Sequence, residues 1–309
     1  MPAVLQNIYR YPVKSMGGQN LTSTRLAAKG IPGDRAWALK DERGLVGAKR
    51  FPELMSCEAR LLSEPSTEQP SPPVEIRCPD GAVCQSDDDQ ITSTLSGLLG
   101  IDVSLWPLMP EDQLDHYLRI PGDPNADPQA ELRKVFARTA DEPLPDLSQF
   151  PAEIFKYQSP LGTYFDAFPL LLMSTNSLAE MQRAAPDSQI DVRRFRPNLL
   201  FDLSSDVATA DSGAAQRPSA ERAFAENPFP ENRFPENEWA GKKLRLGGAT
   251  LKVEMECPRC IMTTHGFGEL PRDPAIMRAL VRANGGNLGV YATVLEPGPV
   301  QLGDALEII

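Results

Sequence analysis

Short strand-like segments that do not alternate with helices are the feature of this sequence that most constrains its fold. Each segment is rich in Val, Leu, Ile or aromatic residues and is bounded by Gly, Pro or Asp, which is the pattern of a β-strand. We predict strands over Val4–Val13, Ala36–Lys40, Val74–Cys78, Val103–Pro107, Leu244–Met255, Gly289–Leu295 and Val300–Ile309. Because strands outnumber helices and do not alternate with them, a doubly wound parallel sheet is disfavoured. We expect an α+β fold that is predominantly β.

Three short helices are expected beside the strands. The first covers Asp87–Leu99, and the second covers Ser174–Ala184, where Ser177 and Glu180 have the spacing of a capping box. The third begins with Asp273 as its N-cap, continues with a proline at the first helical position and ends near a pair of glycines.

Two segments have the composition of connections rather than of a packed core. Residues 119–150 combine prolines with acidic and polar residues, which predicts a linker between one domain over 1–118 and another over 151–309. Residues 204–238 are acidic and carry the near-repeat FAEN, FPEN, FPEN. Units this short do not stack as a solenoid, which needs periods of about 20 residues or more. We therefore expect 204–238 to be a flexible surface insertion, with its last copy anchored by Trp239.

Charge and cysteine content narrow the functional class. The 31 Lys and Arg against 42 Asp and Glu give a net charge of −11, which argues against nonspecific nucleic-acid binding through clustered cations. No apolar run approaches the roughly 18–20 residues that span a bilayer, so we expect no membrane span. The start of the sequence lacks the pattern of a secretory or mitochondrial leader. Together with an odd count of 5 cysteines, this predicts a cytoplasmic protein.

The motif Cys257-Pro258-Arg259-Cys260 directly follows a predicted strand. Such a pair can act as a redox dithiol, as half of a zinc site, or as the source of one thiolate for a soft metal. Zinc is disfavoured because His116, His265 and the other cysteines lack matching spacing. A thioredoxin-like role is disfavoured because we expect residues 261–264 to continue as extended chain instead of opening a helix. Two buried cysteines at a strand end remain the structural alternative.

Three further motifs precede this one in a fixed order. They are YPVKSM at 11–16, GDRAW at 33–37 and RFRPNL at 194–199. With the cysteine motif and its continuation IMTT, the set resembles the MOSC family. It is most similar to the two-domain subgroup that includes the mitochondrial amidoxime-reducing component and its bacterial relatives. The resemblance implies an N-terminal MOSC β-barrel-like domain followed by a C-terminal MOSC β-barrel with a few helices.

The resemblance also implies a molybdenum cofactor and the residues that hold it. By position, Cys260 is the molybdenum ligand and the catalytic residue, which suits a metal that a pterin dithiolene already binds through sulfur. The cofactor-binding positions implied are Lys14, Ser15, Arg35, Asp166, Arg196, Asn198, Arg259 and Tyr291. Cations and hydroxyls among them suit the phosphate of the pterin. At 166–169 only backbone contacts are implied, because Ala167 and Phe168 stand where relatives carry small hydroxyl residues.

The function implied is reduction of small N-hydroxylated compounds, such as amidoximes and N-hydroxylated bases, by oxygen-atom abstraction at molybdenum. The sequence shows no flavin, haem or iron–sulfur motif, so electrons must come from an external donor protein of one of these types. The first alternative is a sulfur carrier or cofactor-handling protein that forms a persulfide on Cys260, with Cys257 in the relay. The second is a binding module without turnover. The sequence leaves open any role of His265 and which of Arg193, Arg194 and Arg196 contact the cofactor.

Overall fold

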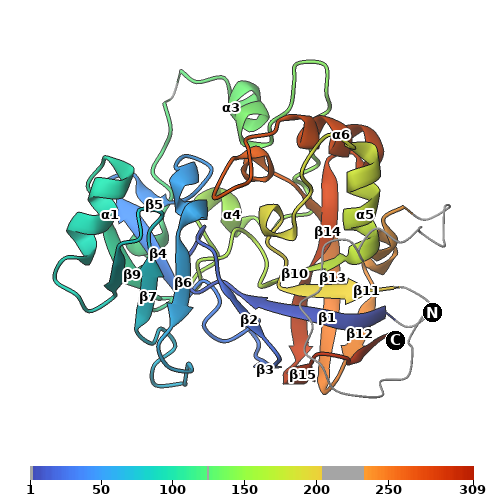
Figure 1. The fold of residues 1–309 in the computed structure, drawn as a ribbon, viewed down its shortest axis with the longest axis horizontal. Helices are drawn as coiled ribbons and strands as arrows, with labels where there is room; N and C mark the ends of the chain where they lie inside the picture. The colour runs from blue at the N-terminus through green and yellow to red at the C-terminus, as the bar shows by residue number, and fades with distance from the viewer. Residues whose placement is uncertain (1–2, 124, 204–232) are drawn as a thin grey trace.

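A closed barrel of seven strands forms the larger part of the molecule (Figure 1). The computed structural model describes residues 3–123, 125–203 and 233–309. The barrel strands are β1 (Ala3–Arg10), β10 (Leu170–Ser174), β11 (Leu199–Asp202), β12 (Lys243–Leu246), β13 (Ala249–Pro258), β14 (Asn287–Glu296) and β16 (Ala305–Ile308). They run in the order β11-β10-β14-β13-β12-β16-β1, and β1 pairs with β11 to close the sheet. The β10–β11 pair is parallel, whereas the other barrel pairs are antiparallel.

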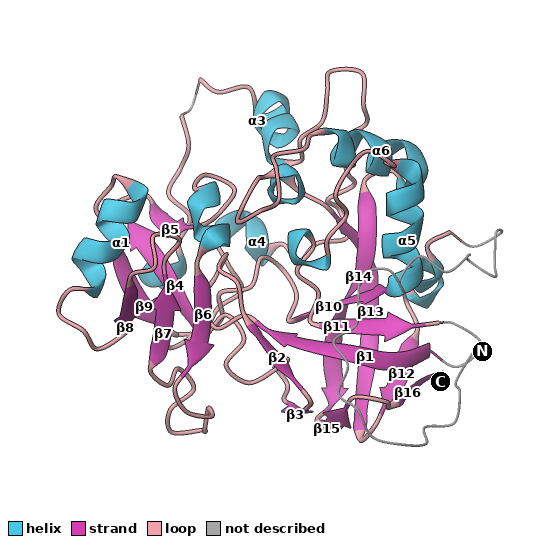
Figure 2. Cartoon of the chain, in the orientation of Figure 1, coloured by secondary structure: helices cyan, strands magenta, loops and turns pink. Residues whose placement is uncertain are grey.

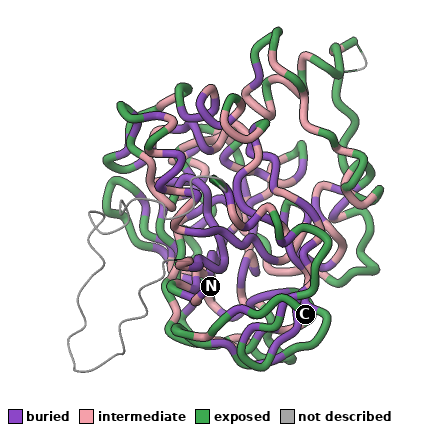
Figure 3. The backbone as a smooth tube through the Cα atoms, turned by 90° about the vertical axis from the view of Figure 1, so that its right-hand side faces the viewer, coloured by how far each residue is buried: buried purple, intermediate pink, exposed green. Residues whose placement is uncertain are grey.

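The barrel core follows from the side-chain pattern of its strands. In β1 buried residues such as Leu5 and Ile8 point into the barrel, where they meet Leu172, Phe201 and Val253. Strand β10 reads LLLMS and is buried at every position, as expected of a strand that is covered on both faces. Its outer face is packed in a second apolar cluster with helices α5 (Thr175–Ala184) and α6 (Ala275–Asn284). The buried residues gather in the middle of the molecule, with exposed chain around them (Figure 3).

Two smaller sheets and a helix form the other part of the molecule (Figure 2). One sheet contains β5, β4 and β9, and the other contains β6, β7 and β8. Their bounds, with those of the helices packed nearby, are β4 (Trp37–Asp41), β5 (Gly44–Val46), η1 (Pro52–Ser56), β6 (Glu58–Leu61), β7 (Val74–Arg77), β8 (Val83–Gln85), α1 (Ile91–Leu99) and β9 (Ser104–Pro107). Val13, Leu39, Leu54, Ile76 and Leu95 belong to their shared apolar core.

Further short elements complete the structure. Strand β2 (Gln19–Leu21) pairs with β1, and β3 (Ser23–Leu26) pairs with β15 (Gly298–Gln301). The remaining helices are α2 (Leu114–Tyr117), α3 (Pro128–Val135), α4 (Glu153–Lys156), η2 (Val192–Arg194), η4 (Pro235–Trp239) and η5 (Ile261–Thr264). Helix α3 lies within the predicted linker 119–150, where Asp127 caps it by accepting a hydrogen bond from the Gln129 amide.

The prediction of a predominantly β, α+β fold is confirmed, with two corrections to the strands. The predicted strand Leu244–Met255 is a hairpin of β12 and β13, because Gly247 adopts a φ of +52° and turns the chain. The predicted strand Val300–Ile309 divides into β15 and β16, because Gly303 adopts a φ of +89° between them. All three predicted helices form, and Ser174 and Asp273 accept hydrogen bonds from backbone amides at the starts of α5 and α6.

The prediction that residues 261–264 continue as extended chain is wrong. They form the 3₁₀ helix η5, which begins directly after Cys260. Its threonines close the turn themselves, because the Thr263 hydroxyl donates to the Cys260 carbonyl at 3.0 Å and the Thr264 hydroxyl to the Ile261 carbonyl at 2.7 Å. The arrangement still differs from a thioredoxin motif, since η5 is a single short turn and β13 is antiparallel to both neighbours.

The predicted surface insertion 204–238 is corrected at its end. Residues 204–232 lie outside the described residues. Beyond them, Phe234 and Trp239 are buried in the apolar core, and Glu236 is completely buried. The Glu236 carboxylate accepts hydrogen bonds of 2.6 Å from the hydroxyls of Ser174 and Ser177 at the start of α5. The end of this segment is therefore part of the packed structure.

The first strand of the chain belongs to the barrel that residues beyond 170 otherwise build. Strand β1 pairs with β11 on one side and with β16 and β2 on the other. The division into domains at 118 and 151 stays a prediction. The barrel, however, is built from β1 together with strands from residue 170 onward. Within the described part, no helix combines the length and the apolar character needed to cross a bilayer.

Candidate functional site

One cavity lies where β1 ends and where β10 and β11 begin. All nine residues that the sequence analysis assigned to the site line this cavity. They are Lys14, Ser15, Arg35, Asp166, Arg196, Asn198, Arg259, Cys260 and Tyr291. The fold brings them together because β1 runs antiparallel to β11 and β10 runs parallel to it, so the three strands place these loops at one end of the barrel.

The cavity is strongly basic although the chain as a whole is acidic. Five of its lining residues are cations, whereas Asp166 is its one lining carboxylate among the described residues. The cations are Lys14, Arg35, Arg194, Arg196 and Arg259. In a chain of net charge −11 this local excess favours an anionic ligand.

Arg196 is the cation with the most unused hydrogen-bonding capacity. Its Nη1 donates to the Met16 carbonyl at 2.5 Å, but its Nη2 is buried and has no partner in the described structure. Burial, and then the neighbouring charge of Arg35, lowers the pKa of Arg196 to about 10, so it still carries its charge at neutral pH. The guanidinium carbons of Arg196 and Arg35 lie 4.2 and 4.8 Å from the ring centroid of Tyr11. This ring therefore supports both arginines by cation–π contact.

Backbone conformation also marks the cavity as a site. Four described residues other than glycine have a positive φ, and three of them line the cavity. They are Ser15 at +72°, Arg35 at +47° and Arg196 at +56°. Such conformations are costly for residues with a Cβ and gather at binding and active sites.

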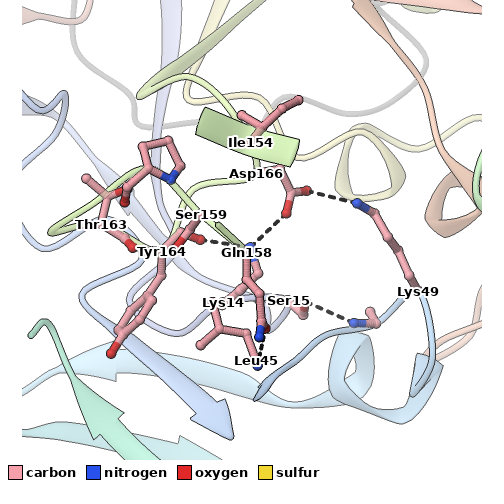
Figure 4. A network of polar contacts seen from close by, with 12 residues as sticks. Lys14, Ser15, Leu45, Lys49, Ile154, Gln158, Ser159, Thr163, Tyr164 and Asp166 are labelled. Atoms are coloured by element: carbon pink, nitrogen blue, oxygen red, sulfur yellow. Dashed lines mark hydrogen bonds and ion pairs between the residues drawn. The ribbon is translucent and has the colours of Figure 1, made fainter. Parts of the chain in front are cut away.

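Asp166 joins two lysines at the edge of the cavity (Figure 4). The Lys14 ammonium donates to Asp166 Oδ1 at 2.7 Å and to the Tyr164 carbonyl at 2.8 Å. The Lys49 ammonium lies 3.8 Å from Asp166 Oδ2. These charges, Lys14 first and Lys49 next, hold the pKa of Asp166 well below its usual range. The sequence analysis assigned only backbone contacts to residues 166–169, whereas the Asp166 side chain fixes Lys14.

The two cysteines of the motif differ in exposure. Cys260 is partly exposed in the cavity, whereas Cys257 and the other three cysteines are buried. The Arg259 Nη1 lies 3.1 Å from the Cys257 sulfur, and its Nη2 donates to the Phe195 carbonyl at 2.5 Å. The Arg259 Nε is buried without a partner. Burial raises the pKa of Cys257, which favours a protonated thiol there.

The side-chain amide of Asn198 is hydrogen-bonded within the protein at both its oxygen and its nitrogen. Its Oδ1 accepts hydrogen bonds from the Leu171 amide and from Arg35 Nη1, at 3.1 and 3.2 Å. Its amide nitrogen donates to Asp34 Oδ2 at 3.1 Å and to the Tyr9 carbonyl. With both ends of its amide engaged, Asn198 holds Arg35 in place and ties β1 to the start of β10.

The structure distinguishes the roles of three residues that the sequence left open, Arg193, Arg194 and His265. Arg193 is half exposed and forms ion pairs with Asp191 and Glu269, outside the cavity lining. Arg194 is buried and donates to backbone carbonyls, one of them that of His265, so its role is structural although it borders the cavity. His265 is buried and is absent from the cavity lining, which argues against a proton donor at the rim.

Lys49 and Tyr11 are the residues that sequence reasoning missed. Lys49 reaches Asp166 only because the fold joins distant segments, and no local pattern marks it. Tyr11 stands in the first of the four motifs, three residues before Lys14, so its place in that motif was a usable signal.

Two family models match the chain. The MOSC N-terminal beta barrel domain matches residues 2–105, and the MOSC domain matches residues 162–307. The chain belongs to the MOSC family. Members of this family are associated with the molybdenum cofactor. The predicted family and the predominantly β fold, with an N-terminal MOSC β-barrel domain followed by a MOSC domain, are thus confirmed.

Solved structures give only a distant likeness. The YUAD protein from Bacillus subtilis is 13% identical, with a TM-score of 0.41 over 100% of this chain and 96% of that one. YiiM from Geobacillus stearothermophilus and YiiM from Escherichia coli are 14% and 15% identical, each with a TM-score of 0.29 over 46% of this chain and 54% of theirs. No curated protein matches the sequence.

The residues of the cavity fit a molybdenum cofactor by their chemistry. A pterin phosphate needs donors, and Arg196 Nη2 and Arg259 Nε are buried donors without partners. A molybdenum dithiolene suits a further soft sulfur ligand, and the thiol of Cys260 is the accessible one. Both requirements are met by residues that line one cavity.

Proposed function

We propose that this MOSC protein binds a molybdenum cofactor in the cavity and reduces small N-hydroxylated compounds. The observation that supports this most is that the accessible thiol of Cys260 lines the same cavity as Arg196 and Arg259, which have buried donors without partners in the described structure. When bound, the cofactor would supply two-electron oxygen-atom abstraction from nitrogen. Cys260 would be its protein ligand.

Four residues of the site then have tasks in holding the cofactor. Arg196 and Arg259 offer unused donors to the phosphate of the cofactor. Lys14 is held by Asp166 and the Tyr164 carbonyl, so its charge is fixed at the edge of the cavity. Ser15 is held by the Ala48 amide, which donates to its Oγ at 3.0 Å, and its own hydroxyl donates to no other described residue. The site is therefore ordered before any ligand enters, which lowers the entropy cost of binding.

The reduction needs an electron donor from outside the described structure. We propose a carrier protein of the flavin, haem or iron–sulfur type. We also propose a cytoplasmic location, which the five free cysteines support.

The test is metal content together with turnover. The protein is purified from cells that make the cofactor, and molybdenum per chain is measured by mass spectrometry. Reduction of benzamidoxime is then followed with a reduced viologen as donor. We expect close to one molybdenum per chain and formation of benzamidine. Full molybdenum without any reduction would reject the reductase and leave only cofactor binding.

A second function is favoured by one observation. Cys257 also lines the cavity, and its sulfur contacts Arg259. A sulfur carrier or cofactor-handling protein would use both cysteines, with a persulfide on Cys260. Sulfane-sulfur labelling of Cys260 in protein that lacks molybdenum would support this alternative, whereas its absence would reject it.

A further inference from the structure

Three aromatic side chains form a cluster at the cavity that Cys260 lines, and the proposed function gives the rings of Phe168 and Phe150 no role. Phe168 and Tyr291 both line the cavity, with ring centroids 5.2 Å apart. The ring centroid of Phe150 lies 6.1 Å from that of Phe168 and 6.3 Å from that of Tyr291. All three are partly exposed. Aromatic surface left accessible next to a reactive group is a binding surface for apolar or planar ligands.

The cavity therefore has two chemically different walls. Three of its five cations, Arg194, Arg196 and Arg259, are buried. The aromatic cluster and Cys260 are more exposed. An anionic group is best held by the buried cations, while the aromatic rings remain for a ligand that enters from solvent and reaches Cys260.

The local backbone holds the aromatic cluster in place. Pro169 follows Phe168 and limits its backbone. Gly30 packs so closely against Pro169 that a Cβ added there would lie 2.9 Å from the Pro169 carbonyl oxygen. The Phe168 segment is thus fixed against the chain that precedes β4. A preset wall of this kind raises affinity because little order is lost on binding.

Building on the proposed reductase, we propose that Phe168, Tyr291 and Phe150 form the stacking wall for the substrate. The wall makes the protein selective for planar aromatic or heteroaromatic N-hydroxylated compounds over aliphatic ones. Phe168 is its specificity-determining residue, because it lines the cavity with Cys260, which Phe150 does not, and it is not one of the cofactor-binding positions, as Tyr291 is. An aliphatic amidoxime presents the same reacting group but no ring to stack.

The test compares benzamidoxime with acetamidoxime in wild-type protein and in the Phe168→Leu and Phe150→Leu variants. Phe155→Leu is the matched control, since Phe155 is 58% exposed on α4 and outside the cavity lining. Leucine keeps apolar bulk but cannot stack. We expect kcat/KM for benzamidoxime to fall about 3- to 10-fold in Phe168→Leu, mainly through KM, as lost stacking predicts. Acetamidoxime turnover and molybdenum content should stay unchanged, and Phe155→Leu should match wild type.

Calorimetric binding of the two amidoximes separates this inference from the proposed function. Wild type that binds benzamidoxime more tightly than acetamidoxime, with the preference lost in Phe168→Leu, supports the wall even if neither compound is reduced. An equal fall for both substrates in Phe168→Leu, or no fall for either, would overturn it. Equal binding of the two amidoximes by wild type would overturn it as well.

Discussion

Replacing Arg196 by lysine separates cofactor binding from folding more sharply than any alanine substitution. Lysine keeps the positive charge and can still reach the Met16 carbonyl, but it lacks the second nitrogen of the guanidinium. In the cofactor-free protein that nitrogen, Nη2, is buried without a partner. Its removal therefore relieves a desolvation cost that offsets any weakening of the bond to Met16. We expect the free energy of unfolding of the cofactor-free protein to change by no more than about 1 kcal/mol.

Cofactor affinity should respond far more strongly. A charge-assisted hydrogen bond to phosphate contributes about 1.5–3 kcal/mol, so its loss weakens binding roughly 10- to 150-fold. The assay is titration of cofactor-free protein with released cofactor, with urea unfolding of the same samples. Arg193→Lys is the control, because Arg193 lies three residues before Arg196, in η2, but outside the cavity lining. Arg196→Lys with wild-type affinity, or an equal loss in Arg193→Lys, would refute the assignment of Arg196 to the phosphate.

Two further predictions concern stability. Glu236→Ala should lower the free energy of unfolding by about 2–4 kcal/mol in urea melts, because the buried hydroxyls of Ser174 and Ser177 lose their acceptor. Glu236→Gln keeps an acceptor and should lower the free energy of unfolding by less, so equal effects of the two substitutions would contradict this. Burial, with the charge of Lys40, lowers the pKa of His116 to about 4. Between about pH 6.5, which is the ordinary pKa of histidine, and about pH 4, the unfolded chain is therefore protonated at His116 whereas the folded protein is not. Stability should therefore fall as the pH drops from about 6.5 towards 4, and His116→Gln should reduce this loss; the same pH dependence in both proteins would contradict it.

The four motifs predict which side chains share one cavity, whereas local pattern does not predict where the strands turn. Residues of the four motifs came together in one cavity because each motif sits at a strand end or in the turn beside it. The turns at Gly247 and Gly303 were missed because each turn is short and strand-like sequence resumes within a few residues after it. The 3₁₀ helix after Cys260 was missed because threonine favours strands in general but here closes a turn with its hydroxyl.

Long-range partners could not be predicted from local pattern. Glu236 stands in an acidic, proline-containing repeat that is typical of a surface, yet it is buried and accepts hydrogen bonds from two serine hydroxyls at the start of α5. Lys49 owes its place at the site to Asp166, which only the fold brings near. The barrel likewise closes between β1 and β11, a pairing between distant parts of the chain.

The central claim is that Cys260 alone supplies the thiolate of the proposed site. It is tested most directly by benzamidoxime reduction with a viologen donor in Cys260→Ala and Cys257→Ala, with circular dichroism of both variants to exclude unfolding. Cys260 is the partly exposed cysteine of the cavity, whereas Cys257 is buried beside Arg259. We expect no activity in folded Cys260→Ala and retained activity in Cys257→Ala, because no nearby residue replaces the soft ligand. Equal inactivation of the two folded variants would contradict the single-ligand site and favour a relay through both sulfurs.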